Sequence, residues 1–456
     1  MKKFLQAMTN VFISFVQRWL PRPFTLAIIL SGLVGVMGVT LCGKTATEMV
    51  NYWGKGFFGL FPFTMQMVLI VVTGHALASA PVVQSMLGAL ASVPRGPKSS
   101  IFLVGFISCL VSYINWGFGL VIGALIAKEV AIRKRGMGIH YPLMIAAVYG
   151  GNVLRGPSSA IPLSVATPGH FLEKVCGIIP VSDTLFSSWN MFITVVLFFI
   201  IPGLCVLLSP NQDDKYPPVE LSPAIIDAEL KRHAEAKAAR SNRGSKKYES
   251  PAQRLDESVI IMLLLVAAGF WYLYNFFVGQ KKFSLNLNTI NFAFMMLGLL
   301  AHGSPARYSA AVNEAVKSVG GIVLQFPFYA GMMGMMRDSG LTIAISNFFV
   351  SISSAKTLPL FTFWSAGLVN IFIPSGGGQW AVQGPIMMEA AKALNADAAK
   401  VTMALCWGDS WTNQIQPFWA LTILAIAGLG VRDIMGYCLS IALLVGIFVS
   451  LCFLIL

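Results

Sequence analysis

Residues 374–380 read Pro-Ser-Gly-Gly-Gly-Gln-Trp and interrupt an otherwise apolar stretch in the second half of the chain. Glycine is a poor helix former, so three consecutive glycines predict a break, with a new helix from Trp380 onward. The start of such a helix offers unpaired N–H groups and the positive end of its dipole, which suit a carboxylate. A plain turn between two helices is the structural alternative. The predicted substrate-binding residues here are Ser375, Gly376, Gly377, Gly378 and Gln379.

A second break is predicted at residues 115–119, Asn-Trp-Gly-Phe-Gly, inside the apolar run 101–127. Irregular backbone is tolerated in a bilayer only where protein buries it or a wet cavity meets it, so such a break is a candidate site. A glycine-rich surface for helix packing is the alternative. The predicted substrate-binding residues here are Asn115, Trp116, Gly117 and Gly119.

Each of these breaks is followed by a polar island between apolar segments, at residues 150–159 and 408–417. A charge inside a membrane segment costs about 2.5 to 3.5 kcal/mol on insertion scales, so Arg155 and Asp409 are functional candidates. Arg155 can pair with a substrate carboxylate, and Asp409 can carry a coupling proton or help to bind Na⁺. Alternatively, the two simply pair with neighbours or with each other. The islands add Ser158, Asn413 and Gln416 as predicted substrate-binding residues.

His75 lies in the apolar run 71–77 and is a candidate proton relay for ion coupling. A single histidine on an apolar face is more often a hydrogen-bonded packing residue, and that interpretation stays open.

The composition places nearly all of these features in a membrane. Of the 456 residues, 56% are hydrophobic and only 11% are charged, whereas a soluble domain has about 25% charged residues. Several apolar runs reach the roughly 20 residues that a transmembrane helix needs. The predicted fold class is an all-α polytopic membrane protein with discontinuous helices, about nine spans and two reentrant hairpins.

The two halves share three weak matches in order: Gln66 with Gln325, Gly119 with Gly377, and Gly150 with Gly408. The nearly constant spacing favours an internal duplication. The first half is predicted to cross the membrane near 24–42, 61–80, 141–169 and 190–209, with a hairpin near 99–128. The second half is predicted to add a span near 258–278, then copies beginning near 286, 321, 400 and 432, with a hairpin near 358–392. The additional span inverts the second repeat.

A polar segment separates the halves, which predicts a first repeat over 1–210, a linker over 211–257 and a second repeat over 258–456. The segment has nine basic and nine acidic residues, so the net charge of +13 belongs to the membrane part. Its alternating charges predict a solvated helix or a mobile linker. Basic residues mark cytoplasmic faces, which places this linker and the N-terminus, with its Lys2, Lys3, Arg18 and Arg22, in the cytoplasm.

The absence of several motifs from the sequence argues against other classes of function. The sequence contains no P-loop, HExxH or GxSxG motif, and its seven cysteines form no CxxC pair. We therefore expect no enzyme, no metal site, no nucleic-acid partner and no cofactor other than H⁺ or Na⁺ as a coupling ion. The remaining mechanism is gradient-driven transport or exchange.

Five blocks resemble the bacterial short-chain fatty acid transporters of the acetoacetate-uptake type. They are VVTGHALASAP (71–81), YINWGFGLVIGA (113–124), GIVLQFPFYAG (321–331), IPSGGGQWAVQGP (373–385) and QPFWALTILAIAGLGVRDIMGYC (416–438). The resemblance implies inverted repeats, reentrant hairpins, a homodimer with an elevator-like mechanism, and secondary active uptake of acetoacetate, butyrate or similar monocarboxylates. It implies symport with H⁺ or Na⁺ across the bacterial inner membrane.

One block departs from the resemblance. Where that family has an uncharged stretch rich in glycine and serine, this chain reads NVLRGPSS (152–159), with Arg155. An additional cation can change the preferred acid or admit a second carboxylate. A dicarboxylate or other small organic anion carrier or exchanger is therefore an alternative function. A membrane-embedded enzyme acting on lipid or isoprenoid is a third, which the missing catalytic motifs disfavour.

Overall fold

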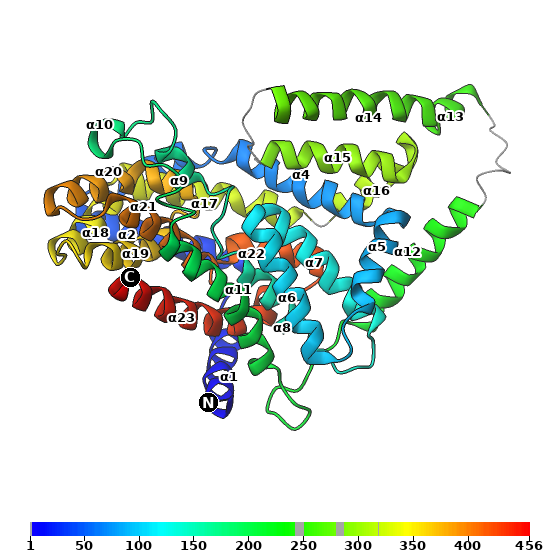
Figure 1. Ribbon diagram of the computed structural model, residues 1–456, viewed down its shortest axis with the longest axis horizontal. Coiled ribbons are helices and arrows are strands. Elements are labelled where there is room, and N and C mark those ends of the chain that lie inside the picture. Colours follow the sequence, from blue (N-terminus) through cyan, green and yellow to red (C-terminus); the bar gives the residue numbers. More distant parts are fainter. Residues whose placement is uncertain (1, 242–249, 280–286, 318) are drawn as a thin grey trace.

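The computed structural model describes residues 2–241, 250–279, 287–317 and 319–456, and these residues form helices and connecting segments without a strand (Figure 1). Within the described ranges six helices are long and apolar enough to cross a membrane, or seven if a bent pair is one span. The prediction of an all-α, polytopic membrane protein is confirmed. The inversion of its repeats stays a prediction.

The described helices differ widely in length, from four to 25 residues. The first half contains α1 (Lys2–Trp19), α2 (Pro23–Cys42), α3 (Ala46–Gly56), α4 (Phe61–Ala78), α5 (Pro81–Ser92), α6 (Pro97–Ile114), α7 (Trp116–Arg133), α8 (Tyr141–Gly151), α9 (Ala160–Val165), α10 (Glu173–Cys176) and α11 (Ser188–Leu208). The rest contains α12 (Pro223–Ser241), α13 (Pro251–Asp256), α14 (Val259–Tyr274), α15 (Leu287–His302), α16 (Pro305–Val316), α17 (Gly320–Asp338), α18 (Leu341–Ser351), α19 (Leu358–Asn370), α20 (Gly376–Leu394), α21 (Ala398–Asn413), α22 (Pro417–Ala427) and α23 (Val431–Ile455).

Helices α6 and α7 form the first hairpin, with Asn115 alone leaving the helical conformation at φ −153° and ψ 122°. Gly119 faces Ser112, and Gly123 faces Ser108 one turn further along, so the arms are antiparallel. A Cβ atom at Gly119 would lie 2.0 Å from the Ser112 Oγ atom. The prediction that these glycines break the helix is therefore wrong, because the break lies at Asn115 and both glycines are helical. They let the two arms approach closely.

This close approach predicts that Gly119→Ala destabilises the protein. Alanine normally improves a helix, but here its methyl group overlaps the backbone and hydroxyl of Ser112, and overpacking of this kind costs about 1–3 kcal/mol. Thermal unfolding followed by size-exclusion chromatography in detergent measures the loss. Gly35→Ala is the matched control, because a Cβ on that α2 glycine meets no atom within 4 Å. Equal melting of the two variants would contradict the packing role of Gly119.

Helices α19 and α20 form the second hairpin. The Gln379 side chain donates to the Ala366 carbonyl at 2.8 Å, and the Gln383 side chain donates to the Ser365 hydroxyl at 2.8 Å. Helix α20 begins at Gly376 rather than at Trp380, so the prediction that the three glycines are non-helical is wrong. The reason is capping, since the Ser375 Oγ atom accepts the Gly378 N–H at 3.2 Å and starts the helix.

The helix after each hairpin packs beside the hairpin's first arm in the same way in both halves. Gly151 of α8 lies against Cys109 of α6, and Gly408 of α21 lies against Ala366 of α19. A Cβ atom at Gly408 would lie only 2.3 Å from the carbonyl oxygen of Phe363. The two hairpins occupy different parts of the molecule in Figure 1, with α22 between them.

The first part of the linker is fastened to the turn that joins α7 and α8. The Glu220 carboxylate accepts the N–H groups of Gly136 and Gly138 at 3.0 and 2.6 Å, and the Val219 N–H donates to His140 Nδ1 at 2.8 Å. Burial lowers the pKa of His140 to about 4, so its ring is neutral and can accept this bond at pH 7. We call residues 219–220 the strap.

Beyond the strap, the linker forms the predicted helix, α12. Glu229 on this helix makes an ion pair with Lys128 of α7 at 2.5 Å, and the helix runs beside α5. The alternative of a mobile linker therefore does not fit its first part. The basic residues Arg243, Lys246 and Lys247 lie outside the described residues.

Candidate functional site

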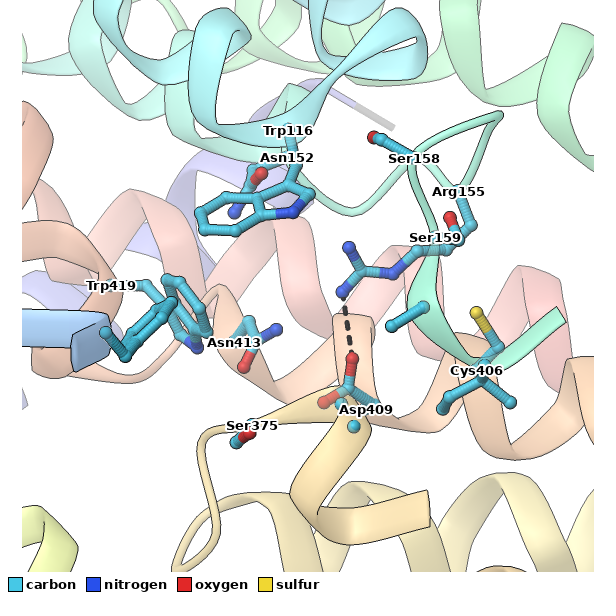
Figure 2. Close-up of a pocket in the computed structure, with 15 residues that line it drawn as sticks. Trp116, Asn152, Arg155, Ser158, Ser159, Ser375, Cys406, Asp409, Asn413 and Trp419 are labelled. Carbon is cyan, nitrogen blue, oxygen red and sulfur yellow. Dashed lines mark hydrogen bonds and ion pairs between the residues drawn. The ribbon is translucent and has the colours of Figure 1, made fainter. Parts of the chain in front are cut away.

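A cavity of about 180 Å³ lies where the helix breaks of the two halves meet (Figure 2). Most of its lining comes from the tip of the first hairpin, the loop between α8 and α9, the start of α20 and the second half of α21. Phe63 of α4 and Trp419 of α22 complete it. The lining residues are Phe63, Trp116, Asn152, Arg155, Ser158, Ser159, Ala160, Ile161, Ser375, Gly376, Gly377, Cys406, Asp409, Asn413 and Trp419.

Arg155 and Asp409 form an ion pair in this cavity, with Arg155 Nη2 donating to Asp409 Oδ2 at 3.1 Å. Only 7% of Arg155 and 5% of Asp409 is exposed. The pair leaves Arg155 Nε and Asp409 Oδ1 buried without a hydrogen-bond partner. Arg155 thus neutralises Asp409 and still has donors to offer. The sequence left open whether Arg155 and Asp409 pair with each other or form a functional site. Both can hold, because the paired Arg155 still has a free donor.

The start of α20 supplies further donors to the same cavity. Ser375 satisfies the Gly378 N–H, whereas the structure records no hydrogen bond from the N–H groups of Gly376 and Gly377. A Cβ atom at Gly377 meets no atom within 4 Å, so this glycine borders open space. A Cβ atom at Gly376 would lie 3.2 Å from Asp409 Oδ2. The positive end of the helix therefore lies next to the ion pair.

The cavity brings together eight of the fifteen residues that the sequence singled out. They are Trp116, Arg155, Ser158, Ser375, Gly376, Gly377, Asp409 and Asn413. The cavity wall does not include Asn115, Gly117, Gly119, Gly378, Gln379, Gln416 or His75. Gln379 holds the hairpin arms together, and the Gln416 amide donates to the Asn370 carbonyl. His75 lies on α4 and takes part in an interaction there.

Hydrogen bonds tie the second polar island to the first half of the chain. The Tyr149 hydroxyl shares its one proton between the carbonyls of Asn413 and Gln416, the latter at 2.9 Å. The Asn370 amide donates to Asn413 Oδ1 at 2.7 Å. The Tyr149 hydroxyl thus pairs with carbonyls at and just beyond the end of α21, and Asn370 fixes the Asn413 side chain, so the break at the cavity is held in a fixed shape.

Seven lining residues were not predicted from the sequence. They are Phe63, Asn152, Ser159, Ala160, Ile161, Cys406 and Trp419. Asn152 and Ser159 belong to the polar island that contains Arg155, so the island itself was the signal. Trp419 lies close to the second island, two residues after its last residue, Pro417. Phe63 carries no local signal, because it is one of many aromatic residues in apolar segments.

Comparison with known proteins identifies the family. A family model described as "Short chain fatty acid transporter" matches residues 4–456. The chain belongs to this family. Two members are described provisionally as short-chain fatty acid transporters. The one from Escherichia coli (strain K12) is 44% identical over 435 residues, covering 95% of this chain and 96% of the relative. The one from Haemophilus influenzae is 40% identical over 440 residues, covering 94% of each.

Membership in the short-chain fatty acid transporter family makes the chain a membrane transport protein and not an enzyme. Two solved structures also align along most of the chain. MtrF of Neisseria gonorrhoeae, reported within a class of antimetabolite efflux pumps, has a TM-score of 0.43 and 16% identity, covering 99% of this chain and 96% of its own. The YdaH transporter of Alcanivorax borkumensis has a TM-score of 0.41 and 15% identity, covering 94% and 99%.

Proposed function

We propose that this member of the family is a secondary active transporter of short monocarboxylates such as acetoacetate or butyrate, coupled to H⁺ or Na⁺. Its membrane is the bacterial inner membrane, with the N-terminus and the linker in the cytoplasm. Family membership supports the substrate class, and the basic residues near the first span support the orientation. The family resemblance also supports a homodimer and an elevator-like movement.

The buried ion pair carries this proposal. A substrate carboxylate can bind the free donors of Arg155 and the N–H groups of Gly376 and Gly377. The cavity would then hold one arginine cation against two carboxylates, one from Asp409 and one from the substrate. An unbalanced charge in a buried site is costly, so one additional cation would enter with each substrate. A proton on Asp409 or a Na⁺ beside it meets this need.

Trp419 favours a substrate with an additional oxygen atom. Its indole Nε1 is buried and has no hydrogen-bond partner, and the residue lines the cavity. A buried donor without an acceptor is costly, so a ligand that supplies the acceptor is favoured. The 3-oxo group of acetoacetate would supply it, whereas butyrate lacks such a group.

Uptake by proteoliposomes tests the proposal. Purified protein is reconstituted, and labelled butyrate or acetoacetate is offered under a proton gradient, a Na⁺ gradient or an imposed membrane potential alone. One cation per carboxylate makes the loaded carrier neutral, so one of the two ion gradients should drive accumulation and the potential alone should not. Uptake that ignores both ion gradients would contradict the proposal. Competition by succinate and not by butyrate would favour the dicarboxylate alternative.

Asp409→Asn should uncouple the transporter. The variant cavity holds only the Arg155 cation, so the substrate carboxylate alone restores neutrality and no additional ion is needed. We expect exchange of labelled for unlabelled substrate to continue, while gradient-driven accumulation is lost. Counterflow and net uptake in the same vesicles measure the two activities. Gradient-driven accumulation at the wild-type level in this variant would exclude Asp409 from coupling.

A further inference from the structure

The cavity has a charged end and an aromatic end. Figure 2 shows Arg155 with Ser158 and Ser159 on one side, and Trp116 and Trp419 on the other. Phe63 belongs to the lining together with the two tryptophans. A ligand with a carboxylate at one end and a short alkyl chain at the other matches this division, because each part meets surroundings of its own polarity.

The aromatic end is firmly packed. The rings of Trp116 and Trp419 meet edge to face, with centroids 4.9 Å apart, and Phe63 meets Trp419 edge to face at 5.7 Å. Behind them, Phe63 stacks on Phe326 at 6.0 Å and on Phe418 at 6.3 Å. A wall backed by a second layer of aromatic rings yields little to a longer ligand, because overpacking a dense core is destabilising.

Phe63 lies on a different helix from the other lining residues. It comes from α4, whereas the rest of the described lining comes from residues 116–161 and 375–419. Helix α4 is held to α15 by hydrogen bonds, among them Gln66 to Asn288 at 2.9 Å and His302 to the Ala76 carbonyl at 2.8 Å. The Phe63 ring is therefore placed by helices outside the hairpins, and it contributes to the aromatic end of the cavity beside Trp419.

We propose that Phe63 sets the upper limit on the chain length of the carboxylate that the transporter accepts. The inference rests on the proposed function, since it concerns the same cavity. The cavity is small, with a volume of about 180 Å³. A carboxylate held at Arg155 with a few carbon atoms fills this space and reaches the aromatic wall. Additional methylene groups in the same direction would meet the Phe63 ring.

The test compares uptake of butyrate, hexanoate and octanoate by wild type and Phe63→Ala in proteoliposomes under the same gradient. A methylene group in an apolar pocket changes specificity by about 10–200-fold, so we expect the ratio of hexanoate to butyrate uptake to rise at least about tenfold. Phe63→Trp, which enlarges the ring, should lower the same ratio. Phe328→Ala is the matched control, because Phe328 is also a half-buried aromatic residue but packs against Trp53 and Phe57 outside the cavity.

An unchanged chain-length profile in Phe63→Ala and Phe63→Trp would overturn the inference. If Phe63→Ala does not reach the membrane, Phe63→Leu replaces it, with a smaller expected rise of the ratio in the same direction. Failure of the proposed function would give a different experimental result. In that case wild type itself shows no gradient-dependent uptake of butyrate or acetoacetate, before any variant is compared.

Discussion

Arg155→Gln is expected to reduce carboxylate uptake about thirtyfold or more. Arg155 is the cation that lines the cavity, and its Nε has no protein partner. Removing one member of a buried, hydrogen-bonded charge pair costs about 2–5 kcal/mol, and each 1.4 kcal/mol is a factor of about ten in affinity. Initial rates of labelled butyrate uptake, measured over a range of concentrations, should show the loss as weaker binding.

The single variant also leaves Asp409 buried without its partner, which costs about 3–5 kcal/mol of stability. The double variant Arg155→Gln/Asp409→Asn separates the two effects, because two neutral amides can hydrogen bond in place of the ion pair. We expect the double variant to reach the membrane in wild-type amounts and to melt near wild type, yet to remain inactive. Wild-type uptake by the double variant would show that the ion pair is only structural.

Gly377→Leu should abolish uptake while leaving the fold intact. A Cβ atom at this position meets no atom within 4 Å, and the glycine lines the cavity, so a leucine side chain would extend into the space proposed for substrate. The side chain also covers N–H groups at the start of α20. We expect uptake to fall below detection, with an unchanged melting temperature in detergent.

Gly32→Leu is the control for this substitution. Gly32 also lies in a helix, α2, and a Cβ atom there meets no atom within 4 Å, but the position is exposed on the outer surface away from the cavity. It should transport like wild type. If Gly377→Leu also transports like wild type, the start of α20 lies outside the substrate path and the glycines serve only as a turn.

The breaks were predictable from the sequence because their cost is local. Glycines and charges inside apolar runs are unfavourable in a membrane, and this signal led directly to Arg155, Asp409 and Ser375. The direction in which a polar side chain points is not local. Gln379 and Gln416 carry the same signal, yet they bond to the carbonyls of Ala366 and Asn370 and lie outside the cavity lining.

The aromatic lining residue Phe63 could not be predicted, because it gives no local signal at all. The chain contains 32 phenylalanines and 10 tryptophans, so nothing in the sequence distinguishes Phe63 from a residue that faces lipid. The register of the duplication was also approximate. The sequence paired Gly150 with Gly408, but the structure gives Gly151 the packing role that corresponds to Gly408. Neighbouring glycines are indistinguishable until the partner helix is known.

The strap has a consequence for how the chain can vary in length. Val219 and Glu220 bond to the turn between α7 and α8, so the number of residues between the end of α11 and Val219 is set by the distance that this segment has to cover. Shortening this segment would pull the strap away from His140. Exposed connectors usually tolerate insertions. In this protein free variation in length, deletions included, should begin only beyond Glu229, after its ion pair with Lys128 of α7.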